Sequence, residues 1–404
     1  MTGQNQNAEL DKANRQAQPE GEQTMEQTSA ASGVEHSATD SLFGPAKNAE
    51  QYMQLLIRNA VKMGVSDIHL KEDAVPYFRI SGAIKPIDSL PPLGDTAMAE
   101  LVQTLSDEEQ RSHFGELNQI DLAQSFGEFG RVRVNMFRQR GKISMVLRLI
   151  PSQMPDPKAM AMPDALTRFS QLKRGMVLVT GPTGSGKSTT LAALIDMINR
   201  SFAKHIVTIE DPIEFVFTDK RSIVNQREVG IDTPSFSDAM RAALRQDPDV
   251  ILIGELRDVI TINTAVKASD TGHLVLSTLH ASGAMETLTR LLSNFPPEEQ
   301  QNVRIALAQN LKGVISQRLV PRADGKGRAM VYEVMTVTKT IQDMIEDPSR
   351  QGEIIQAITN GAQHGMISFD DCLLKLVKEE IITEEVALAN ATNVTDLRLK
   401  LEGY

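Results

Sequence analysis

Residues 181–189 read GPTGSGKST, which fits the pattern G-x-x-x-x-G-K-[ST] of a phosphate-binding loop. Its glycines let the backbone curl so that N–H groups point inward at an anion. Lys187 supplies a charge for the β- and γ-phosphates, and the Ser188 hydroxyl is a ligand suited to Mg²⁺. An apolar run at 176–180 and helical apolar spacing at 189–198 predict a strand, the loop and a helix. The predicted nucleotide-binding residues are Gly181, Pro182, Thr183, Gly184, Ser185, Gly186, Lys187, Ser188 and Thr189.

Composition narrows the class of protein. The 404 residues carry a net charge of −10, which disfavours bulk nucleic-acid binding. Cys372 is the only cysteine, so a disulfide framework and a four-cysteine zinc module are excluded, and a reducing cytoplasm is expected. No segment approaches the ~18 consecutive apolar residues of a transmembrane helix, and the N-terminus does not resemble a secretory signal. Any membrane association would therefore depend on a partner.

Five parts are predicted along the chain. Residues 1–45 are polar and poor in large apolar side chains, which indicates a disordered tail. Residues 46–150 mix helical spacing with short alternating strands, as in an α+β domain. Four prolines mark 151–164 as a linker. Alternating strands and helices in 165–295 predict an α/β core with a mostly parallel sheet and helices on both faces. Residues 296–404 are predicted to be mainly helical, with one strand-like stretch.

Three candidate catalytic residues follow predicted strands of that core. Glu255 comes after the apolar run 250–253, where it would emerge beside the loop and orient Mg²⁺ through water. Glu214 closes a second acidic cluster and is a candidate general base for an attacking water. His280 ends another strand, where it would sense the γ-phosphate or bond a catalytic carboxylate. For each residue taken alone, a structural role or a surface position is the alternative.

Two arginines of the first domain, Arg133 and Arg148, flank a predicted hairpin. Guanidinium groups match phosphate oxygens and stabilise the charge that spreads over the γ-phosphate in phosphoryl transfer. The two side chains either converge on one bound phosphate or belong to a solvated basic hairpin. The spacing alone leaves both interpretations open.

Together these motifs resemble the secretion and pilus ATPase family, in particular its twitching-motility retraction branch (PilT-like). The phosphate loop resembles the Walker A motif of that family. The other segments that carry the resemblance are SDIHL at 66–70, TIEDPIEF at 208–215 (aspartate box), VNQREV at 224–229, DVILIGELRD at 249–258 (Walker B) and TGHLVLSTLH at 271–280 (histidine box).

The resemblance implies a PAS-like α+β N-terminal domain, a RecA-like ATPase core and a helical C-terminal appendage. It implies ATP and Mg²⁺ as cofactors, with Ser188 and Glu255 at the metal, Glu255 through water. It makes Glu214 the catalytic base. It also makes Arg133 and Arg148 a finger and a sensor, one of which reaches the nucleotide of a neighbouring subunit.

The resemblance further implies a cytoplasmic homohexamer, peripheral at the inner membrane. Such a ring docks beneath a platform protein and uses ATP hydrolysis to remove pilins during type IV pilus retraction and twitching motility. An accessory paralogue (PilU-like), or a regulatory nucleotide-binding ring that assists another pilus ATPase, is the alternative. It stays open because residues 340–347 read TIQDMIED, which departs from the usual retraction motif. A nucleic-acid translocase is disfavoured by the acidic charge and the scarcity of aromatic residues.

Overall fold

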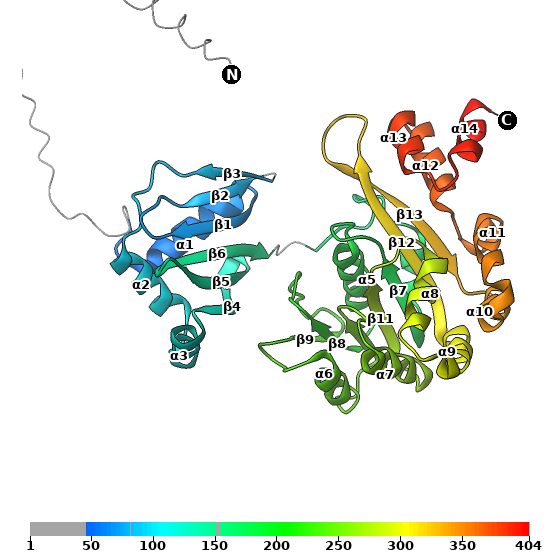
Figure 1. Cartoon of the computed structure of the whole chain (residues 1–404), viewed down its shortest axis with the longest axis horizontal. Helices are drawn as coiled ribbons and strands as arrows, with labels where there is room; N and C mark the ends of the chain where they lie inside the picture. The colour runs from blue at the N-terminus through cyan, green and yellow to red at the C-terminus, as the bar shows by residue number, and fades with distance from the viewer. Residues whose placement is uncertain (1–45, 81, 151–153, 404) are drawn as a thin grey trace, which may run out of the picture. The chain divides into compact units, whose positions relative to one another are not determined.

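The computed structural model describes residues 46–80, 82–150 and 154–403 (Figure 1). The predicted disordered tail, 1–45, lies outside the described residues, as do the first three residues of the predicted linker. In the part of the chain that is described, no helix is long and apolar enough to cross a membrane. The N-terminal domain and the second domain are described in turn.

The N-terminal domain is built on a six-stranded sheet with the strand order β3-β2-β1-β6-β5-β4, in which every neighbouring pair is antiparallel. The sequence of elements is α1 (Ala49–Lys62), β1 (Val65–Lys71), β2 (Tyr77–Ile80), β3 (Ala83–Pro86), α2 (Asp95–Leu105), α3 (Glu108–Leu117), β4 (Gln119–Ser125), η1 (Gly127–Phe129), β5 (Arg131–Gln139) and β6 (Lys142–Ile150).

One face of this sheet is buried and the other carries charge. Along β5, Val132, Val134 and Met136 alternate into a core that they share with the apolar sides of α1 and α2. The alternation follows from the two-residue period of a strand, which sends neighbouring side chains to opposite faces. Arg133 therefore lies on the face opposite the helices. This arrangement matches the predicted α+β domain.

The second domain contains a seven-stranded sheet with the order β13-β12-β7-β11-β10-β8-β9. Its strands are parallel except β13, which pairs antiparallel with β12. The elements are α4 (Ala165–Ser170), β7 (Gly175–Thr180), α5 (Lys187–Ser201), β8 (His205–Glu210), β9 (Ile223–Glu228), α6 (Phe236–Ala243), β10 (Val250–Ile253), α7 (Val259–Asp270), β11 (Leu274–Leu279), α8 (Ala284–Ser293), α9 (Pro297–Asn310), β12 (Leu311–Pro321) and β13 (Arg328–Thr336).

A group of short helices completes the chain after the sheet (Figure 1). They are α10 (Lys339–Glu346), η2 (Pro348–Glu353), α11 (Ile354–Thr359), η3 (Ala362–His364), α12 (Phe369–Lys378), α13 (Glu384–Asn390) and α14 (Val394–Glu402).

Helices cover both faces of the parallel sheet, as predicted. In β7, Met176 and Leu178 pack into a core shared with α6 to α11. Val177 and Val179 point the other way, into a core formed with α4 and α5. Because the strands are parallel, the loops after β7, β8, β10 and β11 all leave from the same edge of the sheet. Open α/β sheets bind ligands at this carboxyl edge.

The C-terminal prediction needs a correction. The stretch 296–404 was expected to be mainly helical with a single strand-like stretch, but β12 and β13 both join the central sheet. A boundary at residue 295 would therefore cut through the sheet. Strand β12 was not predicted because Ser316, Gln317 and Arg318 interrupt its apolar pattern. Their partners lie elsewhere in the fold and cannot be inferred from local spacing.

Candidate functional site

The phosphate-binding loop lies between β7 and α5, as the sequence predicts. Gly181, Gly184 and Gly186 have φ values of 149°, 75° and 89°, which residues other than glycine rarely adopt. A Cβ added to Gly181 would lie 2.3 Å from the carbonyl oxygen of Gln317. The first turn of α5 has amide groups without an intrahelical acceptor and carries the positive end of the helix dipole. The loop therefore presents donors to an anion.

Lys187 bends back over this loop. Its Nζ donates to the carbonyl oxygens of Gly181 at 3.0 Å and Pro182 at 3.1 Å. Burial lowers the pKa of Lys187, while the charges of Glu255 and Glu214 act in the opposite direction. Both predicted carboxylates therefore interact electrostatically with the lysine of the loop.

Glu255 follows β10 and has two basic neighbours. Its Oε2 accepts from Nε of Arg257 at 2.7 Å, and its Oε1 lies 3.5 Å from Nε2 of His280. Nη1 of Arg257 also lies 3.9 Å from Oδ2 of Asp211. The structure thus places His280 beside the predicted catalytic carboxylate of Glu255. Contact with such a carboxylate is one of the two roles expected for His280. Arg257 was not singled out from the sequence, although its position two residues after Glu255 is a usable signal.

The aspartate-box segment adds a carboxylate at the end of β8 that the sequence reasoning did not select. Glu210 accepts from Oγ1 of Thr208 at 2.6 Å and from Nε2 of Gln226 at 3.1 Å. Burial raises the pKa of Glu210, and these hydrogen bonds act against that shift. Glu214, four residues on, is exposed and lines the cavity described next.

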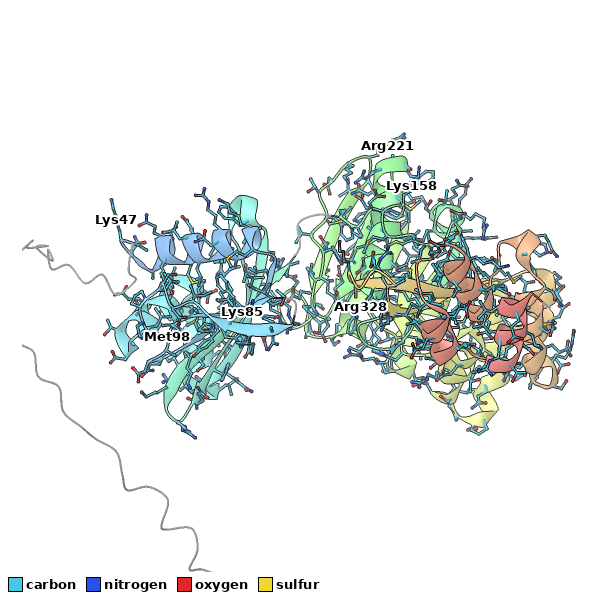
Figure 2. All side chains as sticks on the ribbon, turned by 90° about the horizontal axis from the view of Figure 1, so that it is seen from above. Lys47, Lys85, Met98, Lys158, Arg221 and Arg328 are labelled. Atoms are coloured by element: carbon cyan, nitrogen blue, oxygen red, sulfur yellow. The ribbon has the colours of Figure 1, made fainter. Side chains whose placement is uncertain are left out.

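A cavity of about 700 Å³ joins these groups at the carboxyl edge of the sheet. Gly181, Pro182 and Ser185 of the predicted nucleotide-binding set are not among its lining residues. Arg328, labelled in Figure 2, is an exposed side chain at the start of β13 that also lines the cavity. The polar and charged lining residues include Thr183, Lys187, Ser188, Thr189, Glu210, Asp211, Glu214, Glu255, Arg257, Thr278, His280 and Arg328.

One wall of this cavity is apolar and was not anticipated from the sequence. Met160 comes from the stretch predicted as a linker, and Leu319 and Met330 come from β12 and β13. Phe215, the last residue of the aspartate box, and Phe217, two residues beyond it, add aromatic surface. No local motif marks Met160, Leu319 or Met330, because only the tertiary fold brings them to the loop.

Arg133 and Arg148 lie directly opposite each other on β5 and β6 of the N-terminal domain. Nε of Arg148 donates to Oδ1 of Asp67 at 2.9 Å, and Nε of Arg133 lies 3.5 Å from Oδ1 of Asp121. Burial alone would raise the pKa of Asp67, but hydrogen bonds from Arg148 and Ser66 outweigh it and lower that pKa. The two arginines therefore lie side by side on one face of the sheet, and Arg148 is hydrogen-bonded to the carboxylate of Asp67.

Comparison with known proteins assigns the family. The family described as "Type II/IV secretion system protein" matches residues 46–326, well over half of the chain. The chain belongs to the type II/IV secretion system protein family. Its fold class is confirmed with it: a PAS-like N-terminal domain, a RecA-like parallel-sheet domain and a helical C-terminal part.

Individual members of this secretion family are similar over most of their length. The chain is 42% identical over 336 residues to the type IV pilus retraction ATPase PilT of Pseudomonas aeruginosa, covering 83% of this chain and 97% of that protein. It is 40% identical over 350 residues to the type IV pilus ATPase PilU of the same organism, covering 86% and 90%. A crystal structure of the pilus retraction motor PilT with bound ADP aligns with a TM-score of 0.79 at 42% identity, covering 86% and 99%.

The residues of the cavity fit a magnesium ion that is bound together with a nucleotide. In the described residues there is no group of three or more His, Cys, Asp or Glu side chains that would hold a metal by itself. Ser188, in the first turn of α5, and Glu255 line the same cavity and offer the oxygen ligands that Mg²⁺ prefers. Phosphate oxygens and water would have to supply the remaining ligands, as is usual for this ion in phosphoryl-transfer sites.

Proposed function

We propose that this protein is the ATP-hydrolysing motor of type IV pilus retraction, and so of twitching motility. The observation that carries the proposal is the cavity, which is lined by Lys187 of the phosphate-binding loop together with Glu214, Glu255 and His280. Similarity over nearly the whole length of a retraction ATPase, and to a retraction motor crystallised with ADP, supports both the nucleotide and the cellular role.

We propose the following roles for the side chains of the cavity in hydrolysis. The loop amides and Lys187 hold the β- and γ-phosphates of ATP. Ser188 and, through water, Glu255 would hold Mg²⁺, which would neutralise developing charge on the phosphate oxygens. Glu214 accepts a proton from the attacking water as its oxygen bonds to the γ-phosphorus and the bond from that phosphorus to ADP breaks. His280 orients Glu255 from 3.5 Å away.

We further propose that the working form is a cytoplasmic homohexamer at the inner face of the membrane, docked on an inner-membrane platform protein. In this assembly Arg133 and Arg148 act as finger and sensor, and one of them reaches the nucleotide of a neighbouring subunit. Their opposed positions on β5 and β6, and the bond that fixes Arg148 to Asp67, support a shared task. Arginines in such positions stabilise charge in the transition state of phosphoryl transfer.

The second candidate is an accessory or regulatory ring that assists another pilus ATPase. The 40% identity to PilU over 86% of the chain favours this alternative specifically. It predicts a protein that binds ATP and depends on a partner motor for retraction. The catalytic set around the cavity favours an independent motor.

Complementation separates the two candidates. The chain, and its Glu214→Gln variant, would be expressed in cells that lack the PilT-like ATPase and in cells that lack only the PilU-like one. A motor restores pilus retraction, observed with fluorescently labelled pili, in cells lacking the PilT-like ATPase, and the variant does not. Rescue confined to cells that lack only the PilU-like protein would instead assign the accessory role.

A further inference from the structure

Gln317 is a buried glutamine in the middle of β12 that touches the phosphate-binding loop from behind. Its side chain is fully buried. Strand β12 pairs with β7 up to the contact between Ser316 and Thr180, so Gln317 lies level with the first residue of the loop. Its own carbonyl oxygen is the atom that a Cβ at Gly181 would strike. The side chain therefore reaches from the sheet into the space beneath the loop.

Both polar atoms of this amide are used, and they join the loop to the helix that follows it. Nε2 of Gln317 donates to the carbonyl oxygen of Ser185 at 2.7 Å. Oε1 accepts from the Oγ1 hydroxyl of Thr190 at 2.9 Å. The reverse orientation of the amide would place Oε1 against the Ser185 carbonyl, two acceptors with no proton between them. The carbonyl thus fixes which way the glutamine points.

A consequence for phosphate binding follows from peptide geometry. In a trans peptide the C=O of one residue and the N–H of the next point in opposite directions. Because Gln317 holds the Ser185 carbonyl on the buried side of the loop, the N–H of Gly186 points to the other side. Gly186 lines the nucleotide cavity, whereas Ser185 is buried. The hydrogen bond beneath the loop therefore aims an amide donor at the cavity.

We propose that Gln317 is a positioning residue for nucleotide binding, acting through the Ser185–Gly186 peptide. The inference rests on the proposed nucleotide-binding function and adds to it a residue outside every recognised motif of the chain. The competing interpretation is a buried amide that only stabilises the core. Its effect would then appear in the unfolding temperature and not in the affinity for nucleotide.

Asn199 provides a matched control. It is also fully buried, it lies on α5, and its amide also bridges two segments. Nδ2 donates to the carbonyl oxygen of Thr218 at 2.9 Å, and Oδ1 accepts from the N–H of Lys220 at 3.0 Å. Asn199 lies near the end of α5 away from the phosphate loop. Replacing each amide by an apolar side chain of similar shape, Gln317→Met and Asn199→Leu, removes equivalent bonds at the two places.

The test measures the Kd for ADP by isothermal titration calorimetry on the full-length chain, with the unfolding temperature of each variant. We expect Gln317→Met to raise the Kd about three- to tenfold, the effect of one hydrogen bond, and Asn199→Leu to leave it within about twofold of wild type. The KM for ATP should rise with the Kd while kcat changes less, because a ground-state binding contact is lost. The same Kd for Gln317→Met and wild type would overturn the proposal.

Two further measurements keep the test decisive. If Gln317→Met does not fold, Gln317→Leu replaces it: the leucine side chain has no donor for the Ser185 carbonyl, so the Kd must still rise. Wild-type protein that fails to bind ADP would refute the proposed nucleotide site itself. Wild-type protein that binds ADP, with both Gln317 variants binding equally well, would refute only the positioning role.

Discussion

Replacing Lys187 by methionine should remove most of the affinity for nucleotide without unfolding the protein. The Lys187 side chain is half-buried and its ammonium group donates to two carbonyl oxygens of the loop, so it is already partly desolvated before a phosphate arrives. Two opposite unit charges at about 4 Å interact by about 4 kcal/mol at the effective dielectric of a protein surface. Removing one partner of a hydrogen-bonded charge pair costs about 2–5 kcal/mol. A loss of about 2–4 kcal/mol raises the Kd about 30- to 800-fold.

Lys204 is the matched control for this prediction. It is also half-buried, burial lowers its pKa in the same way, and its Nζ donates to the carbonyl oxygen of Leu172 at 3.2 Å. It precedes β8, at the opposite edge of the parallel sheet from the loop. Calorimetry with ADP should show Lys204→Met within about twofold of wild type. A change of less than threefold in folded Lys187→Met would refute the assignment of Lys187 as the main phosphate-binding charge.

Three further outcomes follow from the structure. Because burial raises the pKa of Glu210, the charged carboxylate destabilises the fold at neutral pH, and Glu210→Gln should raise the melting temperature at pH 8. The difference in melting temperature between variant and wild type should shrink as the pH falls toward 4.5, and a difference that stays constant with pH would contradict the role of the buried charge. A Cβ at Gly313 would lie 2.1 Å from Cζ of Phe169, so Gly313→Ala should cost about 1–3 kcal/mol in thermal unfolding, and Phe169→Leu should recover part of it. Arg148→Ala should lower ATP turnover with ADP affinity unchanged, and mixing it with Glu214→Gln should restore activity above the sum of the two; no gain on mixing would argue against action between subunits.

Local sequence was sufficient to predict those parts of the site whose functional residues are consecutive in the chain. The phosphate loop was predictable because its glycines, lysine and serine occur in one run between a strand and a helix. The opposition of Arg133 and Arg148 was also within reach. A tight turn at Arg140 and Gly141 pairs Gln139 with Lys142, and counting back along the two strands places the arginines face to face.

The remaining parts of the site depend on tertiary contacts that no local pattern encodes. Strand β12 carries Gln317 and Arg318 where a buried strand would be expected to be apolar. The side-chain amide of Gln317 donates a hydrogen bond to the phosphate loop, more than a hundred residues earlier in the chain. Arg318 stacks 4.1 Å above the ring of Phe369 and donates to carbonyl oxygens of Asn390 and Ser282. Polar residues that look unfavourable in sequence are thus explained only once their distant partners are known.

The most direct test of the central claim is ATP hydrolysis by purified wild-type protein and by Glu214→Gln, with the mass of each sample from light scattering. The account predicts Mg²⁺-dependent hydrolysis by a hexamer-sized species. It also predicts a loss of about 10²- to 10⁴-fold in the variant, the contribution of a general base, with ADP affinity retained. Hydrolysis by Glu214→Gln at the wild-type rate would contradict the assigned base. Absence of hydrolysis by a wild-type ring that binds ATP would contradict the motor.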